Sequence, residues 1–200
     1  MVSLVDQSLN YIKNLMSSSL PRGLLFHNIQ HTMEVVQASY IIGSETLKNE
    51  QQIVEIMLAA CFHDSGFIHC YSDHETASAH IAEQFLRSKE LDSAKVERIS
   101  QLILSTQLQV APQNMSEKIL KDADMFHLSK SNYIDYMSKL RQEWSIVLKK
   151  EYAELEWLQL NYSFLKKHKY HTDYANKYLQ PKKEKNIKML KEQHLLFVAL

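Results

Sequence analysis

Hydrophobic residues recur along most of the chain at spacings of three and four, which is the period of an amphipathic α-helix. Near the N-terminus, Val5, Leu9, Ile12 and Met16 fall on one side of such a helix. Helices are expected at about residues 2–16, 26–43, 50–63, 74–89, 93–106 and 117–127, in two segments within 132–165, and at 182–191. Every element that the pattern predicts is a helix, so the expected fold class is all-α.

Composition supports a helical protein with a real core. Glycine and proline number three each, which leaves few turns and makes an all-β fold a poor fit. The 200 residues are 45% hydrophobic, enough for one domain, or one domain with a helical extension. The lysine-rich run at 182–191 is typical of a solvated helix face.

Charge and targeting signals narrow the class of protein. Lys plus Arg and Asp plus Glu number 23 each, so no global basic field attracts nucleic acid. No apolar run has the length of a membrane span, and residues 1–16 do not resemble a signal peptide. The two cysteines, Cys61 and Cys70, form no disulfide framework and indicate a reducing setting. We therefore expect a cytoplasmic protein that binds neither nucleic acid nor membrane.

The stretch at residues 59–67 carries the first chemical signal. An apolar helix ends there at His63 and Asp64, and Gly66 follows as a usual helix stop. Burying an imidazole and a carboxylate together needs a strong compensating partner, and a divalent metal is one such partner. Alternatively, the pair caps the helix or forms hydrogen bonds inside the core.

Further histidines and aspartates lie on other predicted helices. His27 and His31 are four residues apart and share a helix face, with His31 on the inward side. Asp122 and Asp124 interrupt a run that otherwise reads as buried. Because a buried aspartate is costly, we expect one of the two to meet a cation and the other to accept a hydrogen bond or face water.

The helix at 74–89 carries two histidines with different expected surroundings. His74 lies close to the inward stripe of this helix, whereas His80 lies roughly 120° away on the solvent side. His74 is therefore the better site candidate, although it could also be a core histidine bonded to backbone.

The ordered set of His31, the His63-Asp64 pair and Asp124 on separate helices resembles the HD-domain superfamily of metal-dependent phosphohydrolases. The resemblance spans about residues 20–130. It implies a helical metal-binding core at 1–130 and a helical extension, 131–200, packed on that core. Residues 164–172 are also similar to an extension seen in one group of bacterial HD proteins.

The resemblance implies a metal site with four protein ligands: His31, His63, Asp64 and Asp124. In the family pattern the second aspartate of Asp-x-Asp is the ligand, so Asp122 would support it. Imidazole and carboxylate ligands suit Mn, Fe, Co, Ni, Zn or Mg, and the sequence does not distinguish among them. One divalent ion is expected, and a second is left open.

The implied activity is hydrolysis of a phosphate ester of a nucleotide or related small molecule through a metal-activated water, by a phosphomonoesterase or a phosphodiesterase. The candidate catalytic residues are His27, Asp64, His74 and Glu75. His27 would donate the proton to the leaving oxygen, as in a related branch of the family. His74 with Glu75 would provide a second-metal ligand, a general base or a phosphate contact. The candidate substrate contacts are Arg22, Thr106, Gln107 and His168.

Other readings remain open. The same site could bind metal and ligand without turnover, as a regulatory domain. A di-iron oxygenase is a further alternative, since His69 and His74 could help to hold two irons. The chain lacks the extended signature of the cyclic-di-nucleotide branch and a clear Glu-Asp pair after His63-Asp64. The sequence leaves open whether the chain forms homo-oligomers.

Overall fold

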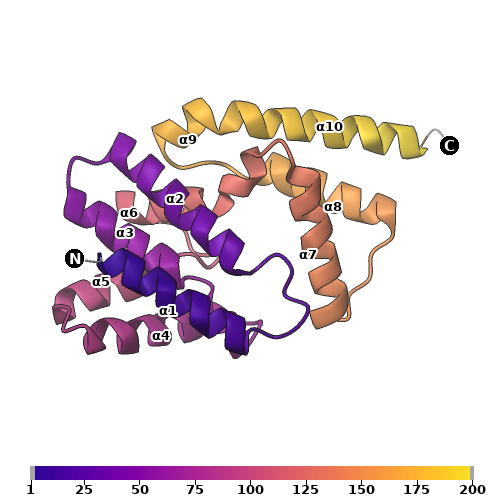
Figure 1. Cartoon of the computed structure of the whole chain (residues 1–200). Coiled ribbons are helices and arrows are strands. Elements are labelled where there is room, and N and C mark those ends of the chain that lie inside the picture. Colours follow the sequence, from indigo (N-terminus) through magenta and orange to yellow (C-terminus); the bar gives the residue numbers. More distant parts are fainter. Residues whose placement is uncertain (1–2, 199–200) are drawn as a thin grey trace. The chain divides into compact units, whose positions relative to one another are not determined.

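The protein is described by a computed structural model, which covers residues 3–198 and, for side chains, residues 3–195. Within this range every regular element is a helix, so the predicted all-α class is confirmed (Figure 1). The α-helices are α1 Leu4–Ser19, α2 Ile29–Thr46, α3 Glu50–Phe62, α4 His74–Ser88, α5 Ser93–Leu104, α6 Met115–Asp124, α7 Tyr133–Val147, α8 Glu154–Lys167, α9 Asp173–Tyr178 and α10 Gln180–Val198. Short 3₁₀ helices follow α3 at Ser65–Ile68 and α6 at Met125–Ser129.

The chain forms two compact units, which we describe separately. The first unit comprises the chain up to Arg22 and His27–Asp124, and so contains α1–α6. The second comprises Gly23–Phe26 and the chain from Met125 onward, with α7–α10.

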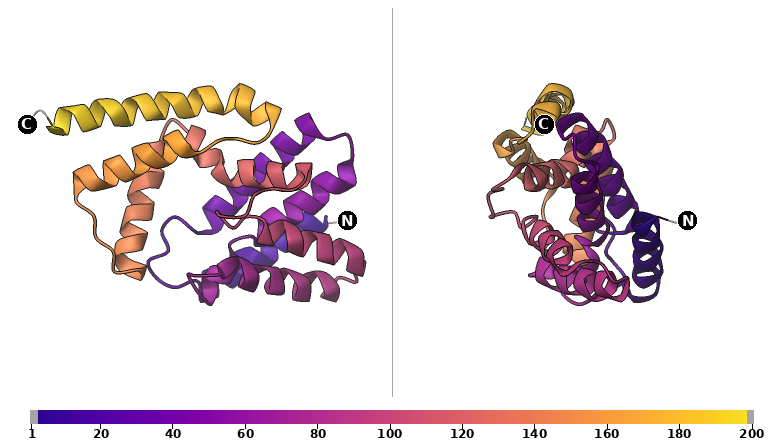
Figure 2. Two further views of the ribbon diagram at one scale, coloured as in Figure 1. Left: turned by 180° about the vertical axis from the view of Figure 1, so that it is seen from behind. Right: turned by 90° about the vertical axis from the view of Figure 1, so that its left-hand side faces the viewer.

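Helix α3 is the centre of the first unit. It contacts α1, α2, α4, α5 and α6 (Figures 1 and 2). Residues 56–62 of α3 are apolar on every side, as expected for a helix segment in the interior of a bundle. The buried hydrophobic residues of α3 are Ile53, Ile56, Leu58, Ala59, Ala60, Cys61 and Phe62. The C-terminal end of α3, where the His-Asp pair begins, is therefore surrounded by other helices.

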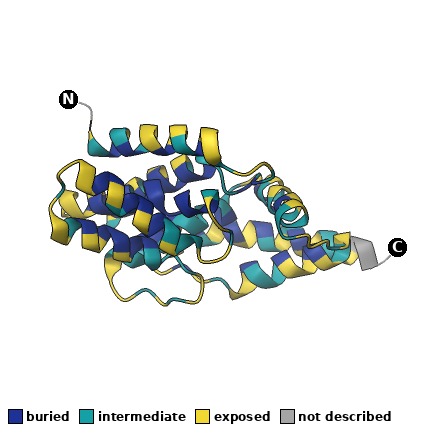
Figure 3. Cartoon of the chain, turned by 90° about the horizontal axis from the view of Figure 1, so that it is seen from below, coloured by how far each residue is buried: buried dark blue, intermediate teal, exposed yellow. Residues whose placement is uncertain are grey.

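Helix α1 shows the amphipathic pattern that its sequence predicts. Val5, Ile12 and Met16 are buried, and the opposite side of the helix is exposed (Figure 3). A capping box fixes its start, because Ser3 Oγ accepts a hydrogen bond from the Asp6 amide and the Asp6 carboxylate accepts one from the Ser3 amide.

Two helix ends differ from the expectation. Helix α2 continues through Gly43 to Thr46. Gly43 lies against Ile53 of α3, where a Cβ would make an ordinary contact at 3.4 Å. Helix α6 ends at Asp124, and the predicted continuation to residue 127 is a 3₁₀ helix. Asp122 and Asp124 thus lie in the last turn of α6 rather than in the middle of a helix.

The second unit has its own apolar core. Buried members of this core are Leu128, Tyr133, Met137, Trp157, Leu158, Leu165 and Leu190. The polar groups of its aromatic residues are bonded: the Trp157 indole donates to the Met137 carbonyl at 3.2 Å, and the Tyr133 hydroxyl to Asn161 Oδ1 at 2.9 Å. These bonds remove the cost of burying a donor in an apolar core.

The prediction that the lysine-rich helix exposes its lysines to solvent is wrong for Lys183 of α10, which is fully buried. Its ammonium donates to the His168 carbonyl at 2.6 Å and lies over the Tyr170 ring, 5.0 Å from the centroid. A hydrogen-bonded ammonium above an aromatic face tolerates burial that a lone charge does not.

No helix in residues 3–198 combines the length and the apolar character needed to cross a bilayer.

Candidate metal centre

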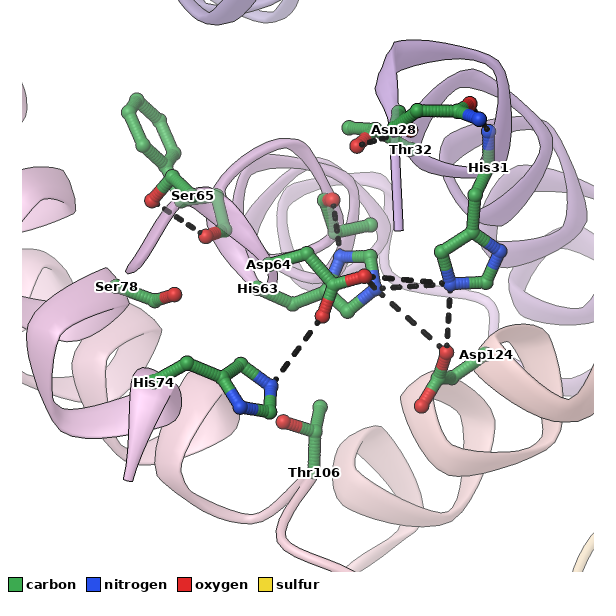
Figure 4. A network of polar contacts seen from close by, with 12 residues as sticks. Asn28, His31, Thr32, His63, Asp64, Ser65, His74, Ser78, Thr106 and Asp124 are labelled. Atoms are coloured by element: carbon green, nitrogen blue, oxygen red, sulfur yellow. Dashed lines mark hydrogen bonds and ion pairs between the residues drawn. The ribbon is translucent and has the colours of Figure 1, made fainter. Parts of the chain in front are cut away.

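The end of α3 brings His63 and Asp64 into the interior of the first unit. His63 is the C-cap of α3 and is 1% exposed, and Asp64 lies at φ −106° and ψ 3° before the 3₁₀ turn. The Ser65 hydroxyl donates to the Phe62 carbonyl at 2.7 Å and closes the helix end. The local turn therefore points both side chains of the His-Asp pair into the bundle (Figure 4).

A backbone hydrogen bond sets the orientation of the His63 ring. Nδ1 of His63 lies 2.9 Å from the Ala60 carbonyl oxygen, which can only accept a hydrogen bond. Nδ1 therefore carries the proton, and in the neutral ring the Nε2 lone pair faces the cluster. A metal-binding histidine is commonly held by such a bond from its other ring nitrogen.

His31 and Asp124 join this pair from two other helices. His31 lies in the first turn of α2, whose start Asn28 caps by accepting from the Gln30 and His31 amides. Nε2 of His31 lies 3.1 Å from Asp124 Oδ1 and 3.4 Å from His63 Nε2. His31, His63 and Asp124 each offer a ligand atom, and these atoms lie within 4.8 Å of one another.

Asp64 adds a fourth candidate ligand atom, an oxygen with an unusual environment. Its Oδ2 atom is buried and has no hydrogen-bond partner, yet lies 3.3 Å from His63 Nε2 and 3.5 Å from His31 Nε2. Ligands at right angles around an ion, with bonds of about 2.1 Å, are separated by about 3 Å. The separations and the buried, unbonded carboxylate oxygen thus fit a divalent cation held by two imidazoles and two carboxylates.

The charges of the cluster depend strongly on one another. Burial opposes protonation of His63, but the Asp64 and Asp124 carboxylates outweigh it and hold the pKa of His63 well above its usual value. Burial alone would raise the pKa of Asp64, yet His63 and His74 beside it lower that pKa well below its usual range. The pKa of Asp124 is lowered in the same way by its hydrogen bonds with His31 and His63. Both carboxylates are therefore charged near neutral pH, as a cation site requires.

Gly66 allows α4 to pack directly on the His-Asp turn. A Cβ at Gly66 would lie 2.0 Å from the His74 carbonyl oxygen and 2.8 Å from the Ser78 amide nitrogen. The Gly66 amide donates to Ser78 Oγ at 2.8 Å, which fixes the contact. Glycine has no Cβ, so α4 can approach this closely. The close approach brings the start of α4 near enough for His74 to reach the cluster.

His74 is the fifth polar side chain at this site. Its Nε2 lies 3.5 Å from Asp64 Oδ1, while its Nδ1 faces the Tyr71 carbonyl at 3.3 Å and the Glu75 carboxylate at 3.6 Å (Figure 4). Burial opposes its protonation, but Asp64 and Glu75 raise the pKa of His74 above its usual value. Asp73, just before it, adopts a left-handed conformation at φ 58°. Its carboxylate accepts from the Thr76 hydroxyl rather than capping α4.

Phe67 contacts both candidate catalytic histidines. Its ring stacks with His74 at a centroid distance of 3.8 Å and an interplanar angle of 19°. It also stacks with His27 at 4.3 Å and 30°. The His27 and His31 rings are 6.1 Å apart, so Phe67 holds His27 beside the cluster. Hydrophobic periodicity gave no sign that Phe67 would have this role.

Comparisons with known proteins agree with this arrangement. The sequence model of the HD domain matches residues 28–129, which is about half of the chain and includes the whole cluster. The chain belongs to the HD-domain family. No curated protein shows significant sequence similarity to it.

Two crystal structures share the fold of this HD protein. A structure of a protein from Listeria innocua matches with a TM-score of 0.62 and 25% identity, over 94% of this chain and 96% of that chain. A structure of a predicted HD superfamily hydrolase from an uncultured Thermotogales bacterium matches with a TM-score of 0.59 and 21% identity, over 96% and 91% of the two chains. Both matches extend beyond residue 129, so the fold similarity includes the C-terminal helices.

The other predicted contacts of the HD domain lie in several places. Thr106 and Gln107 follow α5, and Figure 4 shows Thr106 with its hydroxyl toward His74. Gln107 Nε2 lies 3.5 Å from Asp73 Oδ1. Arg22 is exposed, and no contact described within residues 3–198 joins it to the cluster. His168 belongs to the second unit, where its Nδ1 lies 3.1 Å from Lys183 Nζ.

The remaining histidines and Asp122 are also located. His80 is exposed on α4, as expected, and its Nε2 accepts a hydrogen bond from Gln84 Nε2 at 2.8 Å. His69 is exposed in the turn before α4. Asp122 is fully buried in the last turn of α6.

A separate cavity of about 510 Å³ lies in the first unit, between the starts of α3 and α6 and the side of α5. Its lining includes Arg98, which binds Glu55 through Nε at 2.9 Å and Nη2 at 2.7 Å. None of the four candidate metal ligands lines it. We therefore place the candidate chemistry at the cluster rather than in this cavity.

Proposed function

We propose that this HD-domain protein is a metal-dependent phosphohydrolase that cleaves a phosphate ester of a nucleotide or related small molecule. The observation that carries the proposal is the buried Asp64 Oδ2 atom, which lacks a hydrogen-bond partner and lies 3.3 Å and 3.5 Å from two imidazole nitrogens. The likeness in fold to a protein described as a predicted HD superfamily hydrolase supports it.

In this proposal His31, His63, Asp64 and Asp124 hold the divalent ion. When bound, such an ion lowers the pKa of a water ligand to about 7 and polarises a phosphoryl oxygen. The protein supplies the fixed orientation of the ligands, through the Ala60 carbonyl for His63 and the cap of α2 for His31. Because the ligand side chains are largely buried, little reorganisation accompanies the reaction.

Two histidines flank the cluster as proton carriers. We assign the proton for the leaving oxygen to His27, which Phe67 holds one helical turn from His31. His74 is held between Asp64 and Glu75, and this arrangement suits a residue that orients the nucleophile or contacts a phosphoryl oxygen. Thr106 and Gln107 are proposed substrate contacts on the side of His74.

The proposed substrate class and cell compartment are supported by the composition of the whole chain. A net charge of zero favours a small phosphorylated molecule over a nucleic acid as the partner. The thiols of Cys61 and Cys70 are not joined in a disulfide, which fits the proposed cytoplasmic setting.

The first test is hydrolysis by untagged protein whose metal content has been measured. Phosphomonoesters, nucleotides and cyclic nucleotides would be supplied with manganese, cobalt or magnesium, and phosphate release compared with that of Asp64→Ala. We expect at least one ester to be cleaved by the wild type only. If no ester is cleaved above the rate of Asp64→Ala, the hydrolase proposal is wrong.

A matched pair of variants on α4 tests the assignment of His74. His74→Ala should lower kcat by about 10²-fold or more, the usual scale for a general acid or base. His80→Ala removes an exposed histidine from the same helix and should leave kcat unchanged.

Nucleotide binding without turnover by the wild type would favour a regulatory domain, and substrate-dependent oxygen uptake would favour an oxygenase.

A further inference from the structure

An anionic substrate at the cluster meets several carboxylates of the protein. Asp64, Glu75 and Asp124 lie at or beside the site, and the imidazoles of His31, His63 and His74 lie against them. A phosphoryl group carries negative charge, so it needs protein donors as well as the ion. Arg22, the cation suggested by the sequence, has no described contact with the cluster.

Lys121 lies where such a donor is needed. It is on α6 three residues before Asp124, and residues at this spacing are neighbours on one helix face. Its Nζ atom donates to the Gln107 carbonyl at 2.7 Å. Gln107 directly follows Thr106, whose hydroxyl points toward His74 (Figure 4). Lys121 therefore connects α6 to the loop that borders the site.

The ammonium of Lys121 keeps charge and donors for a ligand. The hydrogen bond to Gln107 goes to a neutral carbonyl and uses one of three N–H donors. Burial lowers the pKa of Lys121, and the nearby carboxylates of Asp124, Glu117 and Glu75 oppose this shift. A half-buried cation near carboxylates from two helices is attracted to the site and interacts strongly with an incoming anion.

We propose that Lys121 binds the anionic phosphoryl group of the substrate at this centre. The proposal rests on the proposed phosphohydrolase function and adds a substrate-binding residue to it. The competing explanation is structural: Lys121 would only tie α6 to the loop after α5 through the Gln107 carbonyl. The two explanations require different properties of the side chain at position 121. Phosphate binding requires its positive charge, whereas the hydrogen bond to the Gln107 carbonyl requires only an N–H donor.

Three variants separate these explanations. Lys121→Arg keeps the charge and the donors, whereas Lys121→Gln keeps an N–H donor and removes the charge. Lys118→Gln removes a charge from the same helix, at a position with no proposed role. The probe is inorganic phosphate, titrated calorimetrically into protein loaded with manganese, after the metal content of each variant has been shown to match that of the wild type.

We expect Lys121→Gln to weaken phosphate binding by about tenfold, which corresponds to about 1.4 kcal/mol. Lys121→Arg and Lys118→Gln should each stay within about threefold of the wild type. With a cleaved ester as substrate, Lys121→Gln should raise KM, and raised ionic strength should weaken phosphate binding less in this variant than in the wild type.

Several outcomes would overturn the inference: wild-type affinity in Lys121→Gln, equal losses in Lys121→Arg and Lys121→Gln, or no phosphate binding by the wild type. Failure of the proposed function has a different signature. If the wild type binds phosphate through Lys121 but cleaves no ester, the inference stands and the hydrolase proposal fails. If esters are cleaved with an unchanged KM in Lys121→Gln, the hydrolase proposal stands and the inference fails.

Discussion

The rings of Phe67 and His74 lie 3.8 Å apart and within 19° of parallel, at the edge of a cluster of two imidazoles and two carboxylates. The same phenyl ring stacks with His27 at 4.3 Å. One apolar side chain, three residues after Asp64, thus contacts both histidines that flank the candidate metal ligands.

Replacing Phe67 by leucine should lower catalytic turnover more than it lowers stability. Leucine keeps the site apolar but removes the aromatic face that orients His27 and His74, and misplaced catalytic groups can cost about 10²-fold in rate. The measurement is kcat at saturating metal, with metal content determined in parallel. The control is Phe85→Leu, which removes an aromatic contact with Tyr11 and Phe62 at another place in the first unit. Equal kcat values in the two variants would show that Phe67 only fills space.

Replacing Gly66 by alanine should destabilise the protein, because the new Cβ would lie 2.0 Å from the His74 carbonyl. Relief requires a backbone shift, and such overpacking costs about 1–3 kcal/mol or more. Gly43→Ala is the matched control, because its Cβ would meet only the Ile53 side chain at 3.4 Å. It should be neutral or stabilise α2 by up to about 1 kcal/mol. Urea unfolding followed by circular dichroism measures both, and equal effects would contradict the packing argument.

Metal should stabilise the wild type and not the Asp64→Asn variant. A ligand present at about 100 times its Kd raises the free energy of unfolding by about 2.7 kcal/mol. Asparagine keeps the size of Asp64 but loses the charge that the buried Oδ2 atom offers to a cation. Thermal unfolding with manganese, and again after chelation, measures the difference. An equal rise in Tm for both proteins would place the metal elsewhere.

Tyr133 should make the protein less stable at alkaline pH. Burial raises the pKa of its phenol above the ordinary value of 10.0, so the folded protein retains a proton that the unfolded chain loses. Below pH 10 the phenol is protonated in both states, so the contribution of Tyr133 to the free energy of unfolding is fully present. Above pH 10 the free energy of unfolding should fall by about 1.4 kcal/mol per pH unit. Tyr133→Phe should flatten this slope at a roughly constant cost of about 1 kcal/mol for the lost bond to Asn161.

Urea unfolding between pH 8 and pH 11 measures the slope of each variant. The control is Tyr178→Phe, which changes an exposed tyrosine of the same unit and should keep the wild-type slope. A steep slope in Tyr133→Phe would show that other groups cause the alkaline loss of stability.

The sequence by itself determined the helices and the order of the chemical groups. The apolar spacing depends on local geometry, so it located α1, α3, α4 and α5 to within a few residues. It also separated the inward His74 from the exposed His80, because the two differ in angle around one helix.

Only the tertiary structure decided which of these groups meet. His31 and Asp124 are 93 residues apart, and their approach depends on the packing of α2 and α6 against α3. The same holds for the stack at Phe67, the bond from Lys121 to Gln107 and the burial of Lys183. In each case the residue type predicts a surface or a generic core position. Its actual surroundings come from backbone atoms and rings of distant segments, which no local period can place.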